Sequence, residues 1–63
     1  MNVMKRFLLN VNDITDYDLF ESALDDNGIR FDIDSGGRYM IKEENAGDVY
    51  RLLKDMPFDY DLI

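Results

Sequence analysis

The side chains in this sequence that could do chemistry are mostly carboxylates, because it contains neither histidine nor cysteine. Their most suggestive spacing is Asp32-x-Asp34-x-Gly36-Gly37, with Glu43 in the twelfth position counted from Asp32. Calcium loops place oxygen ligands at their first, third, fifth and twelfth positions and a glycine at the sixth. Here the fifth position is Gly36, which offers no side-chain oxygen, and the flanking residues alternate like strands where a calcium hand needs helices. We therefore expect a hairpin with solvated aspartates, no metal site and no cofactor.

The composition also argues against catalysis. General bases and nucleophiles are most often histidine or cysteine, and phosphate sites commonly use a glycine-rich loop between a strand and a helix. The sequence has none of these features, and it also lacks the histidine and cysteine that usually bind zinc. A chain of 63 residues leaves little room for a pocket that excludes water. We expect a protein that is not an enzyme.

The charge balance is strongly acidic, with 14 Asp and Glu against 7 Lys and Arg and a formal net charge of -7. Such a charge repels nucleic acid and anionic lipid at long range, so we expect neither direct nucleic-acid binding nor membrane binding. The longest aliphatic and aromatic run, Phe7-Leu8-Leu9, is far shorter than the roughly 20 residues that span a bilayer. A hydrophobic content of 46% is enough for a core. We expect one domain over residues 1–63, located in the cytoplasm.

Residues 29–42 predict a hairpin around which the rest of the chain is arranged. Two runs, residues 29–34 and 38–42, alternate apolar and polar side chains on either side of Ser35-Gly36-Gly37. Such alternation indicates strands with one buried face, and glycine reaches the positive φ that a tight reversal needs. A lone hairpin is marginal in water, so the flanking segments must cover its apolar face.

Residues 14–28 predict a first helix. Thr15 stands three residues before Asp18, which approximates the spacing of a capping box with Thr15 as the N-cap. The pair Asn27-Gly28 ends the helix, because glycine is favoured just past a helix end.

The remaining elements follow from similar patterns. Residues 43–56 predict a second helix with one apolar face, and Pro57 prevents its continuation. Residues 1–11 predict a first strand, and residues 58–63 alternate once more and predict a last one.

The expected order is strand, helix, strand, strand, helix, strand. This is the order of an α+β two-layer ferredoxin-like sandwich, βαββαβ. Such a fold has a four-stranded antiparallel sheet with the first and third strands in the middle and both helices on one face. On that layout the strand residues that face the core are Phe7, Leu9, Val11, Ile29, Phe31, Ile33, Tyr39, Ile41, Phe58, Tyr60 and Leu62.

The same layout leaves one face of the sheet without helices. The two central strands send to it Met4, Arg6, Leu8, Arg38, Met40 and Lys42. One interpretation is that the cations pair with aspartates of neighbouring strands and the apolar groups are ordinary exposed residues. The other is a surface for a protein partner or for self-association, apolar in the middle and polar at the rim, with adaptable methionines. The small core of so short a chain favours the second interpretation.

A second candidate surface is an acidic patch near the end of the first helix, formed by Glu21, Asp25 and Asp26. Negative charge is unfavourable at this end of a helix, by roughly 0.3 kcal/mol or more per residue. The patch either only keeps the protein in solution or forms part of a docking site. The wider acidic shell could also imitate a phosphate backbone and block the basic groove of a DNA- or RNA-binding protein.

Residues 20–55, FESALDDNGIRFDIDSGGRYMIKEENAGDVYRLLKD, resemble small prokaryotic domains described as signal-transducing. In that family a helix ending in Gly-Ile, here Gly28-Ile29, leads into a strand, a glycine-marked turn, a strand and a helix ending in paired leucines, here Leu52-Leu53. The resemblance implies the architecture and carries over no functional residue, because the cysteines and acidic metal motifs found beside some of these domains are missing here.

We therefore expect a small acidic, non-catalytic protein-binding module, a regulator or inhibitor that binds a protein partner or itself as a homodimer. A phage-type accessory protein is one setting for such a module. The alternatives are the nucleic-acid mimic described above and a small-ligand sensor domain. Binding through the apolar residues of the helix-free face should persist at high salt, whereas binding by a nucleic-acid mimic should weaken as salt rises. A sensor domain should gain thermal stability when its ligand is present.

Overall fold

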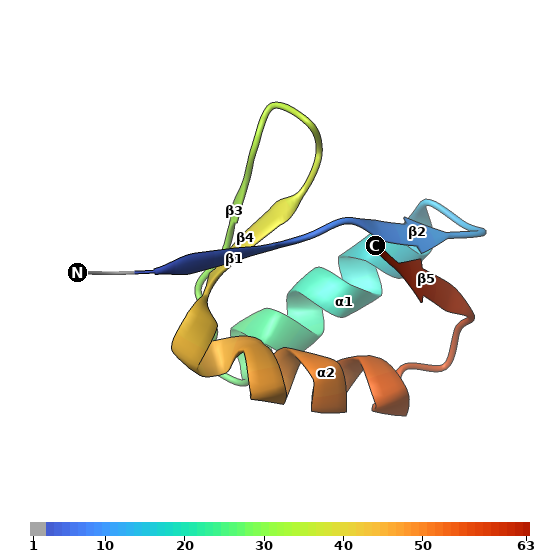
Figure 1. The fold of residues 1–63 in the computed structure, drawn as a ribbon. Helices are drawn as coiled ribbons and strands as arrows, with labels where there is room; N and C mark the ends of the chain where they lie inside the picture. Colours follow the sequence, from blue (N-terminus) through green and yellow to red (C-terminus); the bar gives the residue numbers. More distant parts are fainter. Residues whose placement is uncertain (1–2) are drawn as a thin grey trace.

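The computed structural model describes residues 3–63, which form an α+β fold (Figure 1). In chain order the elements are β1 (Met4–Phe7), β2 (Leu9–Val11), α1 (Thr15–Asp26), β3 (Asp32–Ile33), β4 (Tyr39–Lys42), the short 3-10 helix η1 (Glu43–Asn45), α2 (Ala46–Asp55) and β5 (Tyr60–Leu62). Because β1 and β2 together occupy the predicted first strand, the predicted order of strands and helices is confirmed. Met1 and Asn2, which the sequence also placed in that strand, lie outside the described residues.

The strands form two small antiparallel sheets, so the prediction of a single four-stranded sheet is not met. β4 lies between β1 and β3 in one sheet, and β2 pairs with β5 in the other. The change of partner occurs at Leu8, whose N–H donates to the Ile63 carbonyl at 3.4 Å and whose carbonyl accepts the Ile63 N–H at 2.9 Å. Leu8 belongs to neither β1 nor β2, so the two ladders share no residue and form separate sheets.

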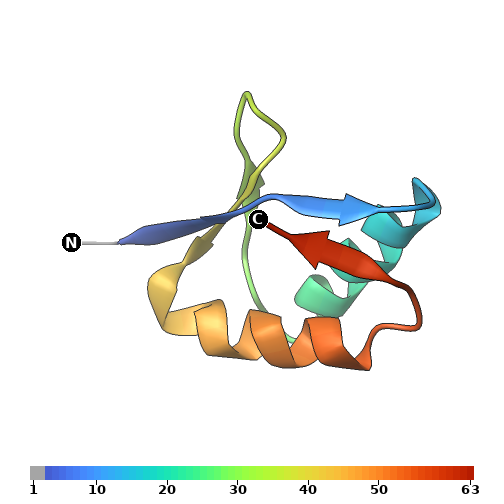
Figure 2. The same ribbon diagram turned by 45° about the vertical axis from the view of Figure 1, so that its right-hand side comes forward.

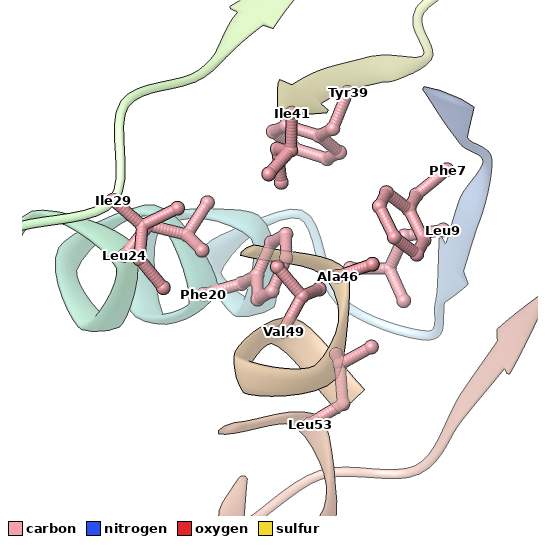
Figure 3. Packing of buried hydrophobic residues seen from close by; sticks show 10 residues of the cluster. All are labelled: Phe7, Leu9, Phe20, Leu24, Ile29, Tyr39, Ile41, Ala46, Val49 and Leu53. Carbon is pink, nitrogen blue, oxygen red and sulfur yellow. The ribbon is translucent and has the colours of Figure 1, made fainter. Parts of the chain in front are cut away.

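Both helices lie on the same side of the strands (Figures 1 and 2). Between the two layers is a core of buried side chains, drawn in Figure 3: Phe7, Leu9, Phe20, Leu24, Ile29, Tyr39, Ile41, Ala46, Val49 and Leu53. The ring of Phe20 on α1 packs edge-on against Tyr39 on β4, with 5.1 Å between the ring centroids. The core therefore joins both helices to the strands of both sheets.

The strand residues predicted to face this core do so with one exception. Phe7, Leu9, Ile29, Tyr39 and Ile41 are buried, and Val11, Phe31, Phe58, Tyr60 and Leu62 are partly buried against them. The exception is Ile33, whose side chain is 52% exposed. β3 has only 2 residues, and the hairpin rises away from the helices in Figure 1, so neither helix covers Ile33.

The predicted capping box at the start of α1 is wrong. No side-chain bond caps the helix from its N-cap residue, Ile14. Instead the Asp13 carboxylate accepts the Thr15 backbone N–H at 3.0 Å and the Thr15 hydroxyl at 2.9 Å. These bonds, the backbone one foremost, hold the pKa of Asp13 below its usual range. The Asp13 carboxylate thus accepts the first free backbone N–H of the helix, that of Thr15. The Thr15 hydroxyl also donates to Asp13.

The end of α1 agrees with the prediction. Gly28 has a φ of 68°, in the left-handed region that favours glycine. Its N–H donates to the Asp25 carbonyl at 3.0 Å, and the Ile29 N–H donates to the Leu24 carbonyl at 2.9 Å. This bonding is a Schellman motif, and the buried side chains of Leu24 and Ile29 supply the apolar contact that accompanies it (Figure 3).

The hairpin turn also uses glycine as predicted. The Asp34 N–H donates to the Arg38 carbonyl at 2.9 Å, and the Gly37 N–H donates to the Asp34 carbonyl at 3.0 Å. Gly37 has a φ of 78°, which closes a three-residue loop of the kind that ends with a left-handed residue.

The second helix is confirmed with a different first turn. Residues 43–45 form the 3-10 turn η1, and the α-helix runs over Ala46–Asp55, two residues short of Pro57. Its buried face is Ala46, Val49 and Leu53.

Candidate functional site

The candidate site is the side of β1 and β4 that faces away from the helices, called here the open face. The strand register places Met4 beside Lys42 and Arg6 beside Met40. Directly opposed residues share one face of a sheet, and the alternate residues of β4 are buried on the other face. The structure therefore places these four residues of the predicted site on one surface.

A groove of about 470 Å³ runs over this surface. It is lined by Met4, Asp25, Arg30, Phe31, Asp32, Met40 and Lys42. Two methionines and a phenylalanine supply its apolar area, and two carboxylates and two cations surround them. Three of the six residues predicted for the open face, Met4, Met40 and Lys42, meet in this groove.

Two lining residues of the groove were assigned elsewhere from the sequence. Phe31 was predicted to face the core, and its ring does pack edge-on against Tyr39 at 5.6 Å, but it is only partly buried and also lines the groove. Asp25 was predicted to lie in the acidic patch on α1. The turn at Gly28 brings the end of α1 close to the start of the hairpin, and no pattern within a single element predicts this approach.

Asp34, at the hairpin turn, holds the two arginines of the predicted site. Its Oδ1 accepts the backbone N–H groups of Gly36 and Arg38, each at 2.9 Å. Its Oδ2 lies 3.4 Å from Arg6 Nε and 4.0 Å from Arg38 Nη1. The bond from the Arg38 N–H, helped by that from Gly36 and by both guanidinium groups, holds the pKa of the Asp34 carboxyl below its usual range.

The cations of the open face thus differ from one another. Arg6 and Arg38 are paired with a nearby aspartate, as the first interpretation of this face held. No ion pair within residues 3–63 involves Lys42. Lys42 therefore differs from the two arginines, and the apolar groove at its side is not explained by their pairing.

Leu8, the remaining predicted residue, lies half-buried where the two sheets meet. It exchanges backbone hydrogen bonds with Ile63, so the two side chains share a face. Ile63 is 76% exposed and adds apolar surface beside Leu8. Ile63 was not among the predicted site residues, although the alternation of residues 58–63 places it opposite the core-facing side chains.

The three residues of the predicted acidic patch do not act as one surface. Glu21 is partly buried, and its Oε2 accepts the Tyr39 hydroxyl at 2.9 Å. Burial, followed by this bond, raises the pKa of the Tyr39 hydroxyl. Asp25 lines the groove of the open face, and Asp26 is exposed. Glu21 thus ties α1 to β4.

A second groove, of about 550 Å³, lies between α1 and the hairpin. It is lined by Ile14, Tyr17, Asp18, Glu21, Ile33, Gly37 and Tyr39. It contains two carboxylates and no cation, and Ile14 at its margin is 80% exposed. Its charge is therefore opposite to that of the cations on β1 and β4.

Over residues 3–63 no cluster of three or more histidine, cysteine, aspartate or glutamate side chains is arranged to hold a metal ion. Within the same residues no helix has the length and apolar character needed to cross a membrane. No protein-family model, curated protein sequence or solved structure matches the chain. The function is therefore inferred from the chemistry of the surfaces described above.

Proposed function

We propose that this chain is a non-catalytic protein-binding module that holds a protein partner against its open face. The proposal is supported by the groove, where Met4, Phe31 and Met40 give apolar surface between charged side chains. No helix of the described chain covers that side of the strands (Figures 1 and 2). Burial of such apolar surface drives protein association, and the unbranched methionine side chains adapt to the partner's shape.

For the fold, we propose a ferredoxin-like arrangement in which the two small sheets act as one interrupted sheet. Across the molecule the strands follow one another as β5, β2 with β1, β4 and β3, and every neighbouring pair is antiparallel. The resemblance of residues 20–55 to small signal-transducing domains is compatible with this order. Because fold does not specify function, the role of regulator or inhibitor rests on the open face. A phage-type accessory protein is one setting for such a role.

The test places a charge on the predicted open-face residues. Met40→Asp should abolish capture of the partner from a host lysate, and Leu8→Asp should act in the same way, because each buries a carboxylate in an apolar interface. Leu19→Asp is the matched control: it makes the same kind of change at a 47% exposed position of α1, on the helix side. Wild-type capture should persist at high salt, since apolar burial is not screened.

Two outcomes would contradict this proposal. One is equal capture by the wild type and by Met40→Asp, provided that thermal unfolding shows both to be folded. The other is loss of capture by Leu19→Asp with retention by Met40→Asp, which would move the binding surface to the helices.

A second candidate function is imitation of a phosphate backbone, and the acidic second groove favours it. Asp18 and Glu21 line that groove with no cation, in a protein of net charge -7. A partner with a basic groove would then bind through α1, so Asp18→Asn should weaken binding while Met40→Asp should not. Binding of this kind should fail as salt rises, because it depends on unscreened charge.

A further inference from the structure

One edge of β1 has no partner strand within the described chain. β4 pairs with β1 on one side, while on the other side β5 pairs only with Leu9–Val11 of β2. The last backbone bonds on that side join Ile63 to Leu8. Figures 1 and 2 show the C-terminus beside the middle of the long first strand, with the β1 half uncovered. An uncovered edge of this kind is a template for another strand.

The register identifies the backbone groups that this edge offers. Val3 accepts the Glu43 N–H at 2.9 Å, so its carbonyl points toward β4. In an antiparallel ladder every second residue bonds to the same neighbour, which turns Met4 and Arg6 the other way. Leu8 continues this series, because its N–H and carbonyl bond to Ile63. The N–H and C=O groups of Met4 and Arg6 therefore point to the open edge.

The edge strand β1 and its neighbour β4 are cationic in an acidic protein. β1 reads MKRF and β4 reads YMIK, so the two strands contain three cations and no carboxylate. Lys5 projects to the helix side, with its Nζ 5.6 Å from the centroid of the Tyr50 ring, and Arg6 projects to the open face. Asp34 already lies 3.4 Å from Arg6, so Lys5, which has no ion pair within residues 3–63, exerts the stronger attraction. An incoming strand meets positive charge on both of its faces.

A second copy of this chain is poorly suited to the edge. If two β1 strands pair about a two-fold axis and both Met4 and Arg6 of each copy are bonded, Met4 of one copy lies opposite Arg6 of the other. Lys5 then lies directly opposite Lys5. Like charges in this position destabilise a strand pair.

We propose that the open edge of β1 binds an extended acidic segment of a partner protein, which adds to the sheet as a further strand with carboxylates opposite Lys5 and Arg6. This deepens the proposed function and rests on it, because the added strand would lie beside the open face and bring its protein onto that face. The backbone of Met4 and Arg6 gives the affinity, and Lys5 selects the charge of the segment.

The first test uses the capped peptide Ac-TVEEVT-NH2 and its lysine counterpart Ac-TVKKVT-NH2 on the 15N-labelled full chain. The acidic peptide should shift the amide signals of Met4 and Arg6 in a saturable manner, with a dissociation constant on the order of 1 mM, because the edge is short. The lysine peptide should bind about tenfold more weakly at low salt. Saturable shifts confined to other residues, no saturable shift, or equal binding of both peptides would overturn the proposal.

A proline substitution separates the backbone edge from the side chains. Met4→Pro removes an N–H that points to the open edge and leaves the bonds to β4 intact, and proline is tolerated at the first residue of a strand. Met4→Pro should weaken binding of the acidic peptide about tenfold, because one backbone hydrogen bond is lost and the proline ring adds bulk at the edge. Met4→Ala, the matched control, keeps the N–H and loses only the side chain, so it should bind the peptide more tightly than Met4→Pro does. Equal loss in both variants would assign binding to the methionine side chain and refute the strand addition.

Failure of this proposal can be told apart from failure of the proposed function. Met40→Asp alters the open face and leaves the β1 backbone intact, so it should abolish partner capture and retain peptide binding. If Met40→Asp abolishes capture while the peptide never binds, the edge proposal alone is wrong. If the free protein sediments in a concentration-dependent manner and Met4→Pro abolishes this, the edge binds a second copy of the chain and the acidic-segment proposal is wrong.

Discussion

Replacement of Gly28 by alanine isolates the cost of one backbone conformation. Gly28 has a φ of 68° at the end of α1, and a Cβ added there would meet no atom within 4 Å. The substitution therefore introduces no clash, and its cost is the strain of an L-residue in the left-handed region, about 1 kcal/mol. A domain of this length has a free energy of unfolding of roughly 3–9 kcal/mol, so the loss is a large share of it.

The same substitution at Gly47 is the matched control. Gly47 lies in the first turn of α2, where φ is negative, and its added Cβ also meets no atom within 4 Å. Alanine favours the helix over glycine by about 0.5 kcal/mol or more. Gly47→Ala should therefore stabilise the protein while Gly28→Ala destabilises it.

Thermal unfolding followed by circular dichroism measures both effects. For a chain of this size about 1 kcal/mol corresponds to a shift of roughly 4–8 °C in Tm, so Gly28→Ala should lower the Tm by that amount and Gly47→Ala should raise it by about half as much. Gly28→Asn should lie between Gly28→Ala and the wild type, because asparagine tolerates positive φ better. A Gly28→Ala variant with an unchanged Tm would refute the left-handed turn at the end of α1.

The hairpin turn and the link between Tyr39 and Glu21 give two predictions about pH. Because the pKa of Asp34 is lowered on folding from an ordinary value of 3.8, its contribution to stability is present above that value and is lost as the pH falls through the lower folded pKa. Asp34→Asn should destabilise the protein at neutral pH and reduce the loss of stability in acid, which urea unfolding between about pH 5 and pH 2 measures; an unchanged acid profile would contradict the role given to this carboxylate. Because the pKa of Tyr39 is raised from 10.0, its contribution is present below pH 10 and is lost as the pH rises through the raised value. Alkaline ultraviolet titration should show one of the 4 tyrosines ionising after the others, and Tyr39→Phe should remove that late step; a late step that survives in Tyr39→Phe would assign it to another tyrosine.

The elements of the fold were predictable because their signals are local. The glycines at the end of α1 and in the hairpin turn have the positive φ values that their positions required. The alternation of residues 38–42 placed Tyr39 and Ile41 in the core and Met40 on the open face. Where the prediction failed, the two cases had different causes. The Asp13 carboxylate engaged Thr15 first, and the short hairpin left Ile33 outside the cover of the helices.

The candidate site was predictable only in part. The alternation within each strand predicts that Met4, Arg6, Met40 and Lys42 share one face, and the structure adds the register that pairs Met4 with Lys42 and Arg6 with Met40. The groove also requires Asp25, which reaches it from the end of α1. Its presence there depends on how the helix is set against the sheet, and that placement is a property of the packed core.

The exchange of partners at Leu8 has a consequence for how the molecule opens. β5 is a strand of 3 residues held to one half of the first strand, whereas β4 holds the other half and is itself supported by β3. Local opening draws on the least supported elements, so β5 can detach while the three-stranded sheet stays closed. When β5 detaches, the unpaired edge extends from β1 into β2. If the proposed partner segment is longer than β1, it must compete with β5 for the edge of β2.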